Sequence, residues 1–154
     1  MGVEIERKFL LAGDGWRALG TPVLFRQGYL SLDPDRTVRV RVEGDQGRLT
    51  IKGRSSGATR GEWEYPLPLA DADDLLARLC QQPLIEKYRR RIDFAGNTWE
   101  VDEFLGANRG LVVAEIELAS EDQAFDKPDW IGAEVTDDKR YYNSSLIKLP
   151  FSAW

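Results

Sequence analysis

Apolar and polar side chains alternate with a period of two along most of the chain, and clusters of Gly, Pro and Asp interrupt this alternation. The pattern is typical of β-strands that are joined by turns. It predicts eight strands, and their close spacing along the chain favours antiparallel neighbours. The predicted strands run from Val3 to Leu11, Val23 to Leu32, Thr37 to Glu43, Arg48 to Arg54, Arg60 to Leu67, Leu84 to Phe94, Thr98 to Phe104 and Leu111 to Ala119.

Helical periodicity is confined to a few segments. The clearest helix is predicted from about Asp71 to Gln82, where leucines recur at helical spacing and Pro83 ends the run. Shorter helices are predicted from Glu121 to Phe125 and after Arg140. We expect the helix from Asp71 to Gln82 to pack on the outside of the sheet.

Charged side chains share one face of most predicted strands. Residues two apart in a strand point to the same side, so Glu4, Glu6 and Lys8 lie opposite Ile5 and Phe9. The same alternation with apolar neighbours recurs at Arg39 and Arg41, at Lys52, at Glu62 and Glu64, at Lys87, Arg89 and Arg91, at Glu100 and Asp102, and at Glu115 and Glu117.

A closed sheet accounts for this recurrence better than an open one, because a barrel can gather the charged faces in its lumen. We therefore predict one domain over residues 1–154. Its fold class is mainly β with some helix, a closed eight-stranded antiparallel β-barrel with a charged lumen. A few helices lie outside the barrel and at the C-terminus. Gln27 and Tyr29 also point inward by phase, either as part of the site or as plain lumen lining.

The charge balance argues against nucleic acid as a partner, because 26 acidic and 21 basic side chains give a net charge of -5. The chain has no histidine, which excludes histidine acid–base catalysis and histidine-ligated zinc. Its lone cysteine, Cys80, cannot form a disulfide framework. With no apolar stretch near the roughly 20 residues that span a bilayer, we expect a cytoplasmic protein without a membrane partner.

A lumen of this kind needs ions, water or a ligand, since crowded like charges repel and buried charges are costly to desolvate. The acidic pairs offer hard oxygen ligands that suit Mg²⁺ or Mn²⁺. The lysines and arginines offer many donors to a polyanion. A metal-bound oligophosphate satisfies both sets, whereas an apolar-ligand carrier would need an apolar lumen.

The sequence resembles the CYTH domain family, or triphosphate tunnel metalloenzymes, whose mark is a first strand with the pattern E-x-E-x-K. Here Glu4, Glu6 and Lys8 match that pattern. The resemblance covers nearly the whole chain. It continues through Arg39-Val40-Arg41, Thr50-Ile51-Lys52, Glu62-Trp63-Glu64-Tyr65, Glu86-Lys87-Tyr88-Arg89, Val101-Asp102, Glu115-Ile116-Glu117, and Glu134-Val135-Thr136 to Arg140-Tyr141-Tyr142-Asn143.

The resemblance implies a tunnel that binds a triphosphate with one or two divalent cations, and it assigns roles by position. The implied metal ligands are Glu4, Glu6, Glu115 and Glu117, with Glu62, Glu64 and Asp102 as further candidates. The implied substrate binders are Lys8, Arg39, Arg41, Lys52, Lys87, Arg89 and Arg140. The catalytic set is Glu4, Glu6, Lys8 and Lys87.

Length and the run Arg26-Gln27-Gly28-Tyr29-Leu30 make the chain most similar to the short bacterial tripolyphosphatases of this family. The leading hypothesis is hydrolysis of inorganic triphosphate to pyrophosphate and phosphate, with Mg²⁺ or Mn²⁺ as cofactor. The alternatives are a class IV-like adenylate cyclase, an organic triphosphatase acting on ATP or thiamine triphosphate, and a non-catalytic polyphosphate-binding module. The oligomeric state stays open, with a homodimer as one option.

Overall fold

The computed structural model describes residues 2–154, and Met1, which the predicted domain includes, lies outside the described residues. Within that range the strands are β1 (Gly2–Leu11), β2 (Val23–Ser31), β3 (Thr37–Glu43), β4 (Gln46–Lys52), β5 (Thr59–Leu67), β6 (Ile85–Phe94), β7 (Asn97–Phe104), β8 (Val112–Glu117) and β9 (Ile131–Glu134). The α-helices are α1 (Leu69–Arg78) and α2 (Asn143–Lys148). Four short 3₁₀ turns lie at Gly15–Ala18, Gly106–Asn108, Lys139–Tyr141 and Phe151–Ala153.

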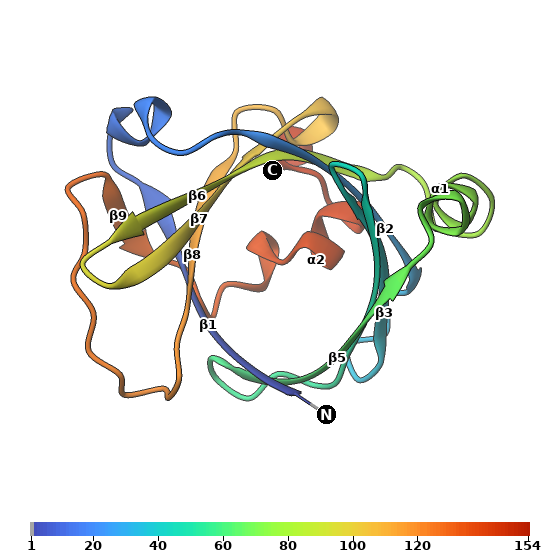
Figure 1. Ribbon diagram of the computed structural model, residues 1–154, viewed down its shortest axis with the longest axis horizontal. Coiled ribbons are helices and arrows are strands. Elements are labelled where there is room, and N and C mark those ends of the chain that lie inside the picture. Colours follow the sequence, from blue (N-terminus) through green and yellow to red (C-terminus); the bar gives the residue numbers. More distant parts are fainter. Residues whose placement is uncertain (1) are drawn as a thin grey trace.

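The first eight strands close into a barrel. They pair in the order β5-β4-β3-β2-β6-β7-β8-β1, and β1 also pairs with β5, so that the sheet returns to its starting edge. Every one of these pairings is antiparallel. Figure 1 looks along the resulting tunnel. The predicted fold class is confirmed.

The short strand β9 was not predicted, and one predicted helix is wrong. β9 pairs with the second half of β1, next to the place where β5 pairs with the first half. The segment from Glu121 to Phe125 forms a turn followed by irregular chain instead of a helix. Its Phe125 ring packs edge-on against Phe9 and Trp99, so the segment covers an apolar surface without helical structure. The helix predicted from Asp71 to Gln82 forms as α1, two residues earlier, and ends at Arg78.

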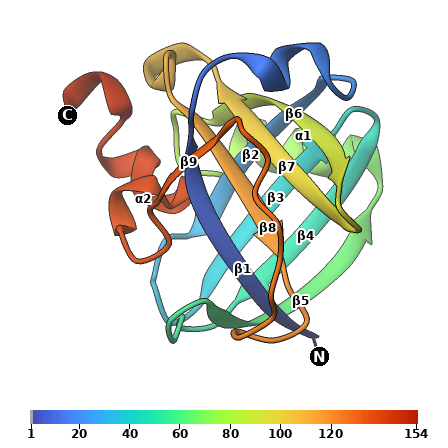
Figure 2. The ribbon, with the colours of Figure 1, turned by 90° about the vertical axis from the view of Figure 1, so that its left-hand side faces the viewer.

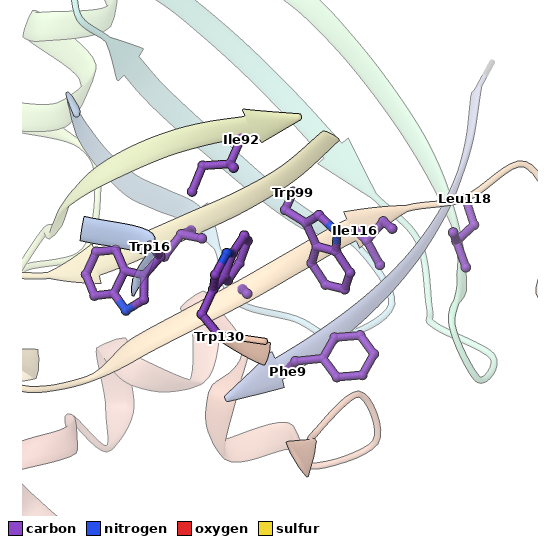
Figure 3. Packing of buried hydrophobic residues seen from close by; sticks show 9 residues of the cluster. Phe9, Trp16, Ile92, Trp99, Ile116, Leu118 and Trp130 are labelled. Atoms are coloured by element: carbon purple, nitrogen blue, oxygen red, sulfur yellow. The ribbon is translucent and has the colours of Figure 1, made fainter. Parts of the chain in front are cut away.

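The largest apolar cluster lies outside the barrel wall, on the faces of β1, β6, β7 and β8 that point away from the lumen. Figure 3 shows its aromatic side chains, among them Phe9, Trp16, Trp99 and Trp130. Phe9, Trp16 and Trp99 are at most 1% exposed. Trp16 and Trp130 therefore have a packing role in this cluster.

Helix α1 covers a second apolar face of the barrel exterior, formed by β3 and β4. Ala72 and Leu76 of the helix pack against Val40 and Val42. Gly28 of β2 lies under the end of this helix, where an added Cβ would come within 2.8 Å of Cys80 Cβ. Two of the apolar clusters therefore lie on the exterior of the barrel.

One end of the lumen is closed by an apolar floor. Tyr29, Ile85, Phe104 and Val113 point inward there and pack with Leu146 of α2. Figures 1 and 2 agree that α2 lies across this end of the barrel. None of the helices in residues 2–154 has the length and apolar character needed to cross a membrane.

Candidate functional site: a charged tunnel

The barrel encloses a cavity of about 230 Å³ that is lined almost entirely by charged and polar side chains. It is bounded at one end by α2 and the residue before it. Of the site residues predicted from the sequence, all but Asp102 and Arg140 line this cavity. The predicted residues that line it are Glu4, Glu6, Lys8, Arg39, Arg41, Lys52, Glu62, Glu64, Lys87, Arg89, Glu115 and Glu117.

Carboxylates gather where β1 meets β8 and β5. The strand register places Glu6 directly opposite Glu117, and Lys8 opposite Glu115. Burial, followed by the charges of Glu115 and Glu4, raises the pKa of Glu6 well above its usual range. Burial and Glu4 likewise raise the pKa of Glu62 to about 7. These carboxyls are therefore too crowded for all of them to ionise at no cost.

Lysines partly balance this acidic wall. Lys52 Nζ donates to Glu4 Oε1 at 2.9 Å and lies 3.5 Å from Glu62 Oε2. Burial opposes ionisation of Glu4, but the charge of Lys52 outweighs it and lowers the pKa of this carboxyl. Lys8 Nζ lies 3.6 Å from Glu115 Oε1. Glu115 and Glu6 raise the pKa of Lys8 against the effect of its burial, so this ammonium stays charged.

The acidic wall fits a divalent cation by its donor chemistry. No three or more His, Cys, Asp or Glu side chains in residues 2–154 stand ready in the arrangement of a metal centre. However, burial and neighbouring carboxylates raise the pKa values of Glu6 and Glu62, and the charges of Lys8 and Lys52 do not offset this effect. Carboxylate oxygens are the ligands that Mg²⁺ and Mn²⁺ prefer. A cation at this wall would replace the protons that crowding otherwise favours.

Arginines form the opposite wall, from β3. Arg39 donates to Thr50 Oγ1 at 3.2 Å, while its buried Nε has no partner among the described protein groups. Arg41 donates to Gln27 and to Glu43, at 2.9 and 3.2 Å. Burial, together with Arg39 and the nearby Arg89, lowers the pKa of Arg41 to about 10. The guanidiniums of this wall therefore have donor capacity and positive charge in excess.

The Phe25 ring lies close to three of the arginines. The guanidinium carbons of Arg41 and Arg89 each lie 5.0 Å from the centre of its ring. Arg91 lies 5.8 Å from the same centre. A cation over a ring face is attracted by the ring quadrupole, so Phe25 helps to hold three like charges around one inward position.

Asp102 lies behind the cationic wall and does not line the cavity. Its carboxylate accepts hydrogen bonds from Arg89 Nε at 2.6 Å and Nη2 at 2.8 Å, and Lys87 Nζ lies 2.8 Å away. Because both oxygens are engaged, the charges of Arg89 and Lys87 overcome the effect of burial and lower the pKa of Asp102. The structure thus gives this residue an ion-pairing position where the sequence suggested a metal ligand.

Lys87 is buried completely between this carboxylate and the C-terminal segment. Its Nζ donates to Asn143 Oδ1 at 2.9 Å. Burial, with the positive charges of Arg89 and Arg41, lowers the pKa of Lys87 to about 7 despite the contact with Asp102. Lys87 is therefore placed to hold or release a proton at the closed end of the cavity.

Arg140 points away from the cavity. Its guanidinium donates to Asp138 at 2.7 Å and stacks over Trp154, and its side chain is 56% exposed. The turn Lys139–Tyr141 is a 3₁₀ helix capped by Asp138, so strand phase does not extend into it. Lys139 lines a second cavity of about 370 Å³, which shares Thr37, Arg60 and other residues with the tunnel.

Several lining residues were not assigned roles from the sequence. Glu43 continues the inward phase of Arg39 and Arg41, so the signal for it was present. Arg60 lies opposite Glu4 in the strand register and shares its strand face with Glu62 and Glu64, so the same signal was present for it. Tyr142 and Asn143 enter from the C-terminal segment and close the tunnel, which strand periodicity cannot show.

Comparison with known proteins agrees with this geometry. The sequence profile described as the CYTH domain matches residues 2–149. This chain belongs to the CYTH domain family. Within it, the chain is 56% identical to an inorganic triphosphatase of Acetivibrio thermocellus, over 98% of this chain and 97% of the relative. It is 37% identical to an inorganic triphosphatase of Nitrosomonas europaea, over 96% of this chain and 99% of the relative.

Solved structures of other proteins have a similar fold. A crystal structure of an inorganic triphosphatase matches with a TM-score of 0.64 and 35% identity, over 93% of this chain and 96% of that one. A Hippeastrum protein, described as an adenylyl cyclase with dominant triphosphatase activity, matches with a TM-score of 0.59 at 13% identity, over 78% of this chain and 80% of that one. The second likeness concerns the fold alone. The predicted family membership is confirmed.

Proposed function

We propose that this protein hydrolyses inorganic triphosphate to pyrophosphate and phosphate, with Mg²⁺ or Mn²⁺ as cofactor. The observation that carries the proposal is the division of one cavity into a carboxylate wall and a cationic wall. Arg39, Arg41, Lys87 and Arg89 face the same space as Glu4, Glu6, Glu62 and Glu117. The names of the two relatives support the same activity.

The cationic wall would bind the phosphate oxygens, and the carboxylate wall would bind the divalent cation. Guanidinium groups donate several directed hydrogen bonds to phosphate oxygens, and Arg41 and Arg89 are held rigidly for this by Gln27, Phe25 and Asp102. Glu4, Glu6, Glu62, Glu115 and Glu117 are the residues that would hold the cation. When bound, a divalent cation neutralises phosphate charge and activates water for attack.

The lysines at the closed end suit the leaving group. Phosphoryl transfer requires positioning and charge stabilisation more than a protein nucleophile. Lys8 and Lys87 both reach the cavity from the end that α2 closes. With a pKa near neutrality, Lys87 is the stronger candidate to give a proton to the departing pyrophosphate. The roles of Glu4, Glu6, Lys8 and Lys87 in catalysis remain part of the proposal.

A phosphate-release assay across inorganic triphosphate, ATP and thiamine triphosphate, each with Mg²⁺ or Mn²⁺, tests the activity. We expect the highest kcat/KM for inorganic triphosphate. Glu6→Gln should abolish turnover because it weakens metal binding, whereas Arg41→Ala should mainly raise KM for triphosphate. Wild-type rates and metal affinity in Glu6→Gln would remove the carboxylate wall from the site.

Two other activities are distinguishable in the same experiment. A cyclase would convert ATP into cyclic AMP and pyrophosphate, which product analysis reveals. A non-catalytic polyphosphate-binding module would bind triphosphate without releasing phosphate. The carboxylate wall disfavours this module, because it repels a polyanion unless cations occupy it.

The setting of the activity is also proposed. The single Cys80 is buried and makes no disulfide, which suits the reducing cytoplasm. The oligomeric state stays open with a homodimer as one option, and light scattering of the purified protein tests it.

A further inference from the structure

Two side-chain amides connect the cationic wall to the segment that closes the tunnel. Arg41 Nε donates to Gln27 Oε1 at 2.9 Å, and Gln27 Nε2 donates to Asn143 Oδ1 at 3.0 Å. Lys87 Nζ donates to the same Asn143 oxygen at 2.9 Å. Asn143 is the first residue of α2 and lines the cavity.

The chemistry of the two cations fixes the orientation of both amides. A guanidinium and an ammonium group donate hydrogen bonds and cannot accept them. Arg41 therefore requires the oxygen of Gln27, which turns the Gln27 nitrogen toward Asn143. Asn143 must then present its oxygen, and Lys87 requires the same oxygen from the other side. A flipped Asn143 amide would direct its NH₂ group at two donors.

The Oδ1 atom of Asn143 thus accepts hydrogen bonds from Gln27 and Lys87, and its Nδ2 amide remains available as a donor. Among residues 2–154, this nitrogen makes no hydrogen bond to another protein group, and it is not one of the fully buried unpartnered atoms. The residue is half-buried at the wall of the cavity. A hydrogen-bond donor at this place has only the cavity's contents as its partner.

We infer that Asn143 is a substrate-binding residue, whose Nδ2 amide donates to an oxygen of the terminal phosphate at the closed end of the tunnel. This inference rests on the proposed function. The apolar floor of Tyr29, Phe104 and Leu146 lies at the same end, so the bound chain of phosphates ends there. The site therefore suits an unsubstituted terminal phosphate. A neutral donor adds a hydrogen bond without adding to the repulsion between Arg41 and Lys87.

Asn143→Asp separates this role from a merely structural one. The variant keeps the acceptor that Lys87 and Gln27 need, but it replaces the amide donor with a carboxylate oxygen that repels phosphate. We expect KM for triphosphate to rise about tenfold or more, with a melting temperature within about 3 °C of wild type. Asn143→Ser, a smaller change that leaves no carboxylate, provides a second variant and should raise KM less.

The matched control is Asn108→Ala. Asn108 Oδ1 accepts a hydrogen bond from the Phe151 backbone amide at 2.9 Å, so it also anchors the C-terminal segment, but it lies outside the cavity. We expect Asn108→Ala to lower stability and leave KM unchanged. If Asn108→Ala raises KM as Asn143→Asp does, loosening of the segment explains both effects and the inference is wrong.

Direct binding distinguishes failure of the inference from failure of the proposed function. The melting temperature is measured in Mg²⁺ with and without a non-hydrolysable analogue of inorganic triphosphate, and a ligand that binds the native state raises it. We expect a clear rise for wild type and Asn108→Ala and a smaller one for Asn143→Asp. Wild-type hydrolysis with an unchanged KM and an unchanged thermal shift in Asn143→Asp overturns the inference alone. Wild-type protein that neither hydrolyses nor binds triphosphate overturns both.

Discussion

Replacing Glu62 with Gln should stabilise the protein at alkaline pH when no divalent cation is present. The carboxyl of Glu62 lies beside Glu4 in the acidic wall, and Lys52 lies nearer to Glu4 than to Glu62, at 2.9 against 3.5 Å. Burial and the Glu4 charge raise the pKa of Glu62 from 4.5 to about 7. Above pH 7 the folded protein therefore carries an ionised carboxyl that the unfolded chain would ionise more readily.

The size of the effect follows from the two pKa values. Since one pKa unit corresponds to about 1.36 kcal/mol, the full difference is about 3 kcal/mol. The Glu62 side chain is 25% exposed, so water screens part of this penalty. We expect Glu62→Gln to raise the free energy of unfolding by about 1 to 2 kcal/mol at pH 8, or about 3 to 6 °C in melting temperature.

The pH dependence fixes the sign. A raised folded-state pKa means that the folded protein binds more protons than the unfolded chain between pH 4.5 and 7. Wild-type stability should therefore fall as pH rises through this window, and the advantage of Glu62→Gln should vanish as pH falls below 4.5. Saturating Mg²⁺ should reverse the order of the two proteins at pH 8, because wild type binds the cation more tightly.

Thermal denaturation in EDTA at pH 5, 6, 7 and 8 provides the measurement. The control is Glu43→Gln, since Glu43 lies 3.2 Å from Arg41, whose charge overcomes burial and lowers the pKa of this carboxyl. That variant should be less stable than wild type at pH 8. A Glu62→Gln protein that is equally stable or less stable at pH 8 would refute the reasoning from crowded carboxyls.

Two further variants test the packing around the barrel wall. Asp102→Asn should lower the free energy of unfolding by about 3 kcal/mol in urea, because Arg89 keeps a buried charge without its carboxylate; near wild-type stability would show that Arg89 finds other partners. Gly28→Ala should cost about 1 to 3 kcal/mol, since the new methyl would lie 2.7 Å from Leu84 and 2.8 Å from Cys80. Gly53→Ala, where an added Cβ has no neighbour within 4 Å, is its control and should be close to neutral.

The strand pattern predicted most of the lumen because inward phase is a local property. Arg39 and Arg41 point into the cavity together, as their spacing of two requires. The same rule placed Glu115 and Glu117 correctly, although they differ in depth: Glu115 is buried and Glu117 is exposed at the mouth. The position of a residue along the tunnel depends on strand register and tilt, and the periodicity of the sequence does not predict either of them.

The partners of each charge could not be predicted from the sequence. Asp102 and Glu100 have the same inward phase, but the register sets Asp102 opposite Arg89, and this pair withdraws its carboxylate from the cavity. Contributions from outside the strands were missed for a related reason. Asn143 reaches the lumen only because α2 packs through Leu146 on the apolar floor. That contact joins residues far apart in the chain.

The same strands carry the apolar core on one face and the site on the other. On β1, Phe9 packs outward in the aromatic cluster while Lys8 faces the cavity, and on β8 the same holds for Ile116 and Glu115. A substitution in the lumen therefore leaves the outer packing in place and acts mainly through charge. Its effect on stability then depends on which wall it changes. Removing a carboxyl from the crowded acidic wall relieves repulsion, whereas removing Asp102 from the cationic wall creates it.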